Sequence, residues 1–337
     1  MKMQTINLST ISEFVAPVAP DGAELYLPEN VESFGDGLWY VISQGIRYAA
    51  PDLSRVAAVC CTVIAVLILL SIFSNLSEST VNTVSLAGVA TVCCLLLNSS
   101  NVLIEQGVET ITQISDYGKM LIPILCTALA AQGGGTSAAA LYAGTIVFNN
   151  ILTTLLKNVL IPVIYIYIVI CIANRALENE ILDSIAKLIK DGISWILKTT
   201  LYLFTGYMTI TGVVSGSVDA AAIKAAKITI SSSVPVVGGI LSDASEALLA
   251  GIGIAKSTAG VTGLLIILAI WIGPFLKIGI QYLLLKLTGS VCVVFSCKSV
   301  AKLVNDFSSA MGFLLAAIGS IGFIHLVSTV CFIKGVA

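Results

Sequence analysis

Long apolar runs separated by short polar intervals make up most of this chain. A helix needs about 20 predominantly apolar residues to cross the hydrocarbon core of a bilayer. Runs that approach or exceed this length cover residues 56–73, 81–97, 151–173, 199–217, 261–285 and 311–333. We therefore predict an all-α fold, a polytopic integral membrane helical bundle with about six long spans.

Two further apolar stretches are broken by glycine or proline. Gly133, Gly134 and Gly135 interrupt residues 120–148, and Pro235, Gly238 and Gly239 interrupt residues 231–251. Each glycine destabilises a helix interior by about 1 kcal/mol relative to alanine, and proline has no amide hydrogen to donate. We expect two broken hairpins at these positions, either re-entrant or tightly turned, in addition to the long spans.

Three segments carry polar and apolar residues at helical spacing, and we expect them to form amphipathic helices at the membrane surface. They cover residues 31–50, 101–118 and 174–198. The first should end at Pro51. The third is the most regular, and the charges on its polar face, including Lys187 and Lys190, predict a single helix parallel to the membrane.

These boundaries divide the chain into four units. Residues 1–55 form an N-terminal extramembrane or interfacial segment, and 56–118 form a membrane hairpin with an amphipathic connector. Residues 119–217 and 218–337 form two membrane units, each with one broken hairpin. The last two units run through similar pieces, so an internal duplication is one reading and ordinary glycine usage in membrane helices is the other.

Composition supports lipid as the main solvent of the chain. Hydrophobic residues make up 57% of the sequence and charged residues 11%, against about 25% charged in soluble domains. A net charge of -2 without a basic block argues against a nucleic-acid partner. Residues 1–30 lack the basic start and continuous apolar core of a secretory signal, so we expect no cleavable segment there.

Metal and cofactor sites are not expected. Most of the nine cysteines lie inside apolar runs, where they pack as small hydrophobic side chains. The chain has one histidine, His325, which lies within an apolar run. We interpret His325 as hydrogen-bonded to a neighbouring helix rather than as a proton carrier.

Two acids, Asp243 and Glu246, follow the second glycine break. Their three-residue spacing is typical of a capping box, which would satisfy free amides at the start of a helix. The alternative is that they face a substrate or ion path beside an interrupted membrane helix. The residues proposed for a conduit or hinge are Gly133, Gly134, Gly135, Thr136, Ser137, Asn149, Asn150, Pro235, Gly238, Gly239, Ser242, Asp243 and Glu246.

Small residues four positions apart indicate close helix packing in lipid. Gly212 and Gly216 form one such pair, and Gly312 and Ala316 form another.

Two stretches carry a resemblance to a known family. The stretch GGGTSAAALYAGTIVFNN at 133–150 resembles the stage III sporulation protein AE family of endospore-forming bacteria. The stretch from Asp219 to Gly251, which contains SVPVVGGILSDASEALLAG, carries the resemblance more specifically. The resemblance covers most of the chain and is strongest over residues 119–333. Members are usually described with an N-terminal signal sequence, which residues 1–30 do not show.

The resemblance implies a role in the apparatus that links mother cell and forespore and supports late forespore gene expression. Members are integral proteins of the mother-cell-derived membrane around the forespore. Their partners include a separate ATPase and ring-forming subunits of the same stage III complex, besides the lipid bilayer.

Three function classes follow from these observations. The glycine-broken hairpins favour a membrane channel or export-platform subunit, whereas the packing faces favour a purely structural anchor for rings and a partner ATPase. A membrane-embedded enzyme is the third class. The sequence contains no nucleotide-binding Gly-Lys-Ser/Thr motif, no paired histidines and no serine-nucleophile elbow, so we expect no catalytic residues and no cofactor.

Overall fold

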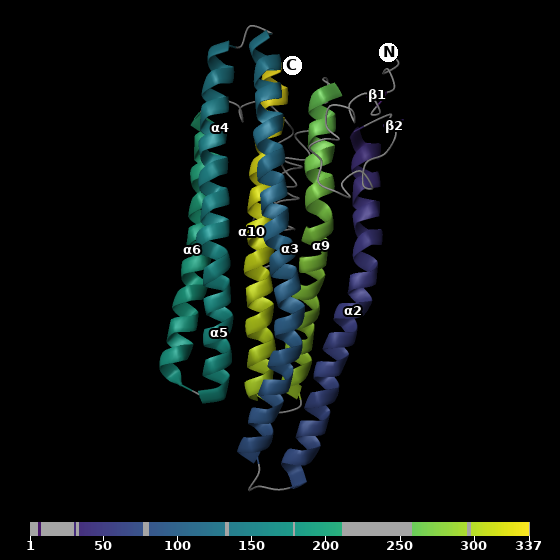
Figure 1. The fold of residues 1–337 in the computed structure, drawn as a ribbon, viewed down its shortest axis with the longest axis vertical. Helices are drawn as coiled ribbons and strands as arrows, with labels where there is room; N and C mark the ends of the chain where they lie inside the picture. Colours follow the sequence, from purple (N-terminus) through teal and green to yellow (C-terminus); the bar gives the residue numbers. More distant parts are fainter. Residues whose placement is uncertain are drawn as a thin grey trace, which may run out of the picture.

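The computed structural model describes residues 6–7, 30–31, 34–76, 81–131, 135–177, 179–210, 258–294 and 298–336. In this part of the chain, long helices lie side by side along one common direction (Figure 1). The helices are α2 (Phe34–Leu76), α3 (Val81–Ala131), α4 (Gly135–Leu155), the π-helical segment η3 (Leu156–Leu160), α5 (Ile161–Leu177), α6 (Glu180–Ile210), α9 (Thr258–Val294) and α10 (Lys298–Val336).

A short antiparallel ladder precedes the helices. It pairs strand β1 (Ile6–Asn7) with strand β2 (Asn30–Val31), with Ile6 opposite Val31.

Helix α10 forms the centre of the bundle, between α3, α5 and α9 (Figure 1). Every residue from Ala310 to Leu326 is buried. This segment contains no Asp, Glu, Lys or Arg, so surrounding it with other helices leaves no charge inside. The bundle is therefore organised around an uncharged segment of α10 that is covered by the neighbouring helices.

Polar contacts between helices add specificity to this apolar packing. Trp271 Nε1 donates to the Ile318 carbonyl oxygen at 3.1 Å, joining α9 to α10. Gln281 Nε2 donates to Ser99 Oγ at 3.1 Å, joining α9 to α3. Hydrogen bonds of this kind hold helices together in membranes, where the hydrophobic effect does not separate protein from lipid tails.

Five helical segments are long and apolar enough to cross a membrane, by length and composition among the described residues. They are Gly35–Ile72, Leu86–Pro123, Tyr142–Leu177, Gly263–Val294 and Ser299–Val330. A helical architecture with several such segments is therefore confirmed. The predicted span at 199–217 is not among them: residues 199–210 form the end of α6, and 211–217 lie outside the described residues.

The predicted surface helix over residues 31–50 is wrong in its boundary. Helix α2 continues through Pro51 to Leu76. Packing against α9 explains why, because Gly45 lies against Ile272 and Asp52 Oδ2 pairs with Lys277 Nζ at 2.8 Å, on either side of the proline. Tertiary contacts on both sides outweigh the one backbone hydrogen bond that Pro51 removes.

The predicted surface connector over residues 101–118 is also wrong, because these residues are an interior part of α3. Ile104, Ile111 and Ile114 are buried in the bundle core, while Glu105 and Glu109 are exposed. The amphipathic pattern was real, but its apolar face packs on protein rather than on a bilayer surface.

Residues 174–198 are two helices rather than one. Helix α5 ends at Leu177 and α6 begins at Glu180, and α6 lies alongside α5 in the direction of the bundle (Figure 1). Asn179 caps the new helix, since its Oδ1 accepts the Ile181 amide at 2.8 Å. The prediction of one helix over residues 174–198 is therefore wrong.

Helices α4 and α5 form one continuous rod, here called the α4–α5 rod, over residues 135–177. The π-helical segment η3 joins them immediately before Pro162, and the Ile161 amide bonds to the Leu156 carbonyl five residues back. The wider turn accommodates the proline, which cannot donate to the carbonyl four residues before it and whose ring would clash there.

At the first glycine break, α3 ends at Ala131 and α4 begins at Gly135. Both are ends of long helices, and Gly133 and Gly134 lie outside the described residues. The second break, at residues 235–239, also lies outside them. The two broken hairpins therefore remain predictions.

Replacing Gly322 with alanine should destabilise the bundle. A Cβ at this position would lie 2.6 Å from Trp271 Nε1, the atom that bonds to α10. Overpacking of this kind costs about 1–3 kcal/mol, which thermal unfolding in detergent would measure. Gly206→Ala is the matched control, because nothing lies within 4 Å of its added Cβ; equal melting temperatures for the two variants would contradict the packing.

Candidate functional site

A row of polar side chains lies along the inner part of the α4–α5 rod. Thr145, Asn149, Thr153 and Lys157 follow one another every four residues, so they share one face of the helix. Thr145 and Asn149 are each 1% exposed. Thr153 Oγ1 donates to Ser115 Oγ of α3 at 3.0 Å, so this face of the rod meets α3.

His325 of α10 reaches the same place through a glycine of α3. A Cβ added to Gly118 would collide with the His325 ring and would lie 3.4 Å from Asn149 Nδ2. Gly118 thus leaves room for both side chains. We call the set Ser115, Tyr117, Thr145, Asn149, Thr153, Lys157 and His325 the polar seam.

Several polar atoms of the polar seam have no protein partner within the described part of the chain. They are Tyr117 Oη, Thr145 Oγ1, both side-chain amide atoms of Asn149 and His325 Nε2. His325 Nδ1 lies 2.9 Å from the Ile321 carbonyl oxygen, so Nδ1 carries the proton in this contact and Nε2 is a free acceptor in the neutral ring. His325 therefore bonds to its own helix, not to a neighbouring one as expected from the sequence.

Buried polar atoms without a partner are costly, at about 1–3 kcal/mol each. A cluster of them with both donors and acceptors is a chemically suitable place for water or a small polar solute. The polar seam thus presents the donors and acceptors that a polar species inside the bundle would need.

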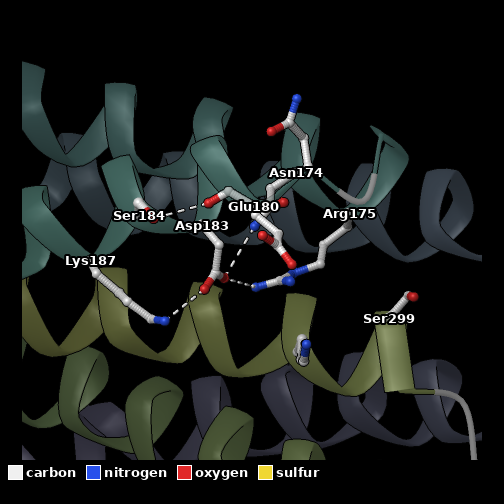
Figure 2. Close-up of a pocket in the computed structure, with 9 residues that line it drawn as sticks. Asn174, Arg175, Glu180, Asp183, Ser184, Lys187 and Ser299 are labelled. Atoms are coloured by element: carbon white, nitrogen blue, oxygen red, sulfur yellow. Dashed lines mark hydrogen bonds and ion pairs between the residues drawn. The ribbon is translucent and has the colours of Figure 1, made fainter.

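A second polar site lies at one end of the bundle, where the α5–α6 turn faces the start of α10 (Figure 2). It is a cavity of about 570 Å³. Residues from three helices line it: Asn174 and Arg175 at the end of α5, Asn179, Glu180, Asp183, Ser184 and Lys187 at the start of α6, and Ser299 and Lys302 of α10. We call it the end cavity.

An ion pair closes the inner side of the end cavity. Arg175 Nε and Nη2 donate to Asp306 Oδ2 at 3.1 and 2.8 Å, and the two side chains are 11% and 19% exposed. Their positions differ by 131 residues, so the pair fixes the α5–α6 turn to α10. Removing either partner would leave a poorly solvated charge.

Asp183 connects this pair to the cavity surface. Its carboxylate accepts from Asn174 Nδ2 at 3.3 Å and pairs with Lys187 Nζ at 2.8 Å (Figure 2). The hydrogen bond from Lys187 holds the pKa of Asp183 below its ordinary value. Because the folded-state pKa is the lower one, the stabilisation from this contact is present at neutral pH and is lost as the pH falls through the lowered pKa.

The structure describes only part of the site predicted from the sequence. Asn149 lies in the polar seam, whereas its neighbour Asn150 is exposed. Gly135, Thr136 and Ser137 form the first turn of α4. Gly133, Gly134, Pro235, Gly238, Gly239, Ser242, Asp243 and Glu246 lie outside the described residues.

The predicted packing residues are divided in the same way. Gly312 lies against Tyr282 of α9, and Ala316 is fully buried. Gly212 and Gly216 lie outside the described residues.

Comparison with known proteins identifies the family of this chain. A family model described as Stage III sporulation protein AE matches residues 33–335. The chain belongs to this family. The stage III sporulation protein AE of Bacillus subtilis (strain 168) is 25% identical to it over 271 residues, which are 78% of this chain and 68% of that protein. No solved structure matches this chain.

The resemblance inferred from the two sequence stretches is thereby confirmed. The polar seam and the end cavity both lie within the residues that match the stage III sporulation protein AE family. Among the described residues no group of three or more His, Cys, Asp and Glu side chains is placed to hold a metal ion.

Breaking the Arg175–Asp306 pair should destabilise the folded protein. We expect Arg175→Gln and Asp306→Asn each to lower stability by about 3–5 kcal/mol, because each leaves one buried charge without its partner. The double variant should lose much less stability than the sum of the two single losses. Thermal unfolding in detergent of the wild type, the two single variants and the double variant completes this double-mutant cycle.

Arg55→Gln provides the matched control. Arg55 is 83% exposed and lies 3.6 Å from Asp52, so its loss should change stability by less than about 1 kcal/mol. Additive losses for Arg175 and Asp306 would contradict the coupling.

Proposed function

We propose that this chain is a non-enzymatic channel or export-platform subunit of the sporulation apparatus that links mother cell and forespore, and that it supports late forespore gene expression. The polar seam is the observation that carries this proposal. Asn149 of α4 and His325 of α10 meet at Gly118 of α3, and both keep buried polar atoms that have no partner among the described residues. In membrane proteins, buried polar clusters of this kind mark paths for polar species.

The position of the seam agrees with the path suggested by the sequence. It runs along the α3–α4 pair, which ends and begins on either side of the first glycine break, Gly133 to Gly135. Asn149 is one of the conduit residues predicted from the sequence. A path entering near this break in the sequence would follow the polar face of α4.

The alternative is a structural anchor for ring-forming subunits and a partner ATPase, without a conduit of its own. The observation that favours it is the dense packing of α10, where every residue from Ala310 to Leu326 is buried. On this reading the Arg175–Asp306 pair and the interhelical hydrogen bonds serve only to hold a rigid platform.

The setting completes the proposal. The chain would be a multi-pass protein of the mother-cell-derived membrane around the forespore, working with other proteins of the stage III complex. Energy for export would come from the separate ATPase, because the sequence has no nucleotide-binding Gly-Lys-Ser/Thr motif.

Asn149→Leu separates conduit from platform. Leucine has a similar volume, so a seam that only packs should tolerate or even benefit from the removal of unpartnered amide atoms. If the seam carries a polar species, the variant should reach the membrane in normal amounts but fail to support late forespore gene expression. A forespore-specific reporter together with an immunoblot for the protein measures both quantities.

Asn150→Leu is the matched control, since its side chain is exposed on the neighbouring face. Normal reporter activity from both variants would favour the platform. Low activity from both would show a general effect on this part of α4.

The same logic applies to Asp243 and Glu246, outside the described residues. The double variant Asp243→Asn, Glu246→Gln keeps the capping hydrogen bonds but removes two charges. We expect it to accumulate and assemble yet block late forespore gene expression; normal spore yield would remove these acids from the conduit.

A further inference from the structure

Helix α6 carries an apolar stripe that nothing in the described part of the chain covers. Ile181, Leu188, Trp195 and Tyr202 recur every seven residues, and their exposed fractions are 69%, 73%, 67% and 74%. Seven residues are close to two helical turns, so the four side chains lie in one line along the helix. The opposite side of α6, with Ile193, Leu197 and Phe204, is buried in the bundle core.

A polar stripe runs beside the apolar one. Lys187, Asp191, Ser194 and Lys198 are spaced by four, three and four residues, which places them on a neighbouring face. Lys187, Asp191 and Lys198 are exposed. These charges are the reason that α6 does not resemble a membrane span by composition, although it has 31 residues.

The contacts of α6 place both stripes level with the uncharged part of α10. At one end Asp183 lies within 3.8 Å of Arg175, which binds Asp306 of α10. At the other end the rings of Phe204 and Phe323 have centroids 6.4 Å apart. From Asp183 to Phe204 α6 extends about 31 Å, close to the thickness of a hydrocarbon core.

An apolar groove continues the stripe onto the neighbouring rod. Its volume is about 120 Å³, and it is lined by Leu155, Val159 and Val163 of the α4–α5 rod and by Ile189, Ile193 and Ile196 of α6. The rod itself exposes Val159, Ile166 and Val169 to 41%, 50% and 63%. Tyr142–Leu177, the span-capable part of this rod, thus shares one outward apolar surface with α6.

We propose that α6 crosses the bilayer as a further membrane helix, with its apolar stripe and the adjoining groove against lipid acyl chains and its polar stripe against water. The apolar stripe should face lipid, because it is continuous with the apolar surface of the α4–α5 rod, which is long enough to cross a membrane. The polar stripe should face water, because Lys187, Asp191 and Lys198 cannot face hydrocarbon at the same depth. The proposed lipid contact does not depend on the proposed function. The proposed water contact at the polar stripe does, because it would form part of the proposed conduit.

Single cysteines at two adjacent positions test both stripes at one depth. Ser194→Cys lies on the polar stripe and Trp195→Cys on the apolar one, in full-length protein without native cysteines and reconstituted in phosphatidylcholine liposomes. A charged, membrane-impermeant thiosulfonate should modify Ser194→Cys. It should modify Trp195→Cys at least about tenfold more slowly, because the reactive thiolate is disfavoured in an apolar environment.

Each other outcome overturns a defined part of the proposal. Equal, fast modification at both positions would place α6 in water and remove the membrane crossing. Protection of both would show that protein, not water, covers the polar stripe. Asp191→Cys and Leu188→Cys, one turn away, repeat the comparison in case a variant at 194 or 195 does not assemble.

A measurement with the native side chain supports the lipid contact independently. Phospholipids brominated on the acyl chain should quench tryptophan fluorescence of the wild-type protein more than that of Trp195→Phe. Equal quenching would overturn lipid contact at Trp195. Neither assay requires sporulation, so an inactive or active Asn149→Leu strain leaves their interpretation unchanged.

Discussion

Lipid offers no hydrogen bonds, so a polar group at membrane depth must find its partner within the protein or in enclosed water. The arrangement of this bundle follows from that constraint. Its most deeply buried helix, α10, occupies the centre. The Trp271 indole, the Gln281 amide nitrogen and the Lys277–Asp52 pair find partners on neighbouring helices. The polar seam departs most from this rule, since Asn149 and His325 are as buried as the core residues but keep polar atoms without a partner in the described part of the chain. Ser100 Oγ and Gln281 Oε1 are the isolated cases outside the seam.

The two polar sites stand in a simple relation along α10. Asp306 belongs to the ion pair beside the end cavity and His325 belongs to the polar seam. They are nineteen positions apart, or about 28 Å of helix, which is close to the thickness of a hydrocarbon core. The residues between them, from Phe307 to Ile324, contain no charge. Under the proposed function, polar sites at the two ends of this tightly packed segment would make a closed conduit. The same dense packing is why a platform is the alternative.

Sequence reasoning found the solvent, the helical class, the family and one residue of the seam. It failed where tertiary contacts outweighed a local signal. Pro51 does not end its helix because Gly45 and Asp52 pack on α9 on either side of it. The break between α5 and α6 had a local signal, since Asn179 precedes two acids, Glu180 and Asp183, that favour a helix start. His325 and Asn149 are 176 positions apart, and no local pattern predicts that Gly118 brings them together.

Hydroxyl-radical footprinting of the wild-type protein in nanodiscs, read by mass spectrometry, tests the central claim that the polar seam is hydrated. Radicals generated by X-rays form from water, so they oxidise buried side chains that contact enclosed water. Tyr117 and Tyr167 are 3% and 2% exposed, but Tyr167 packs edge-to-face on Phe313, whereas Tyr117 adjoins Gly118 and its hydroxyl has no partner among the described residues. The account predicts faster oxidation of Tyr117 and His325 than of Tyr167. Equal protection of all three would contradict it.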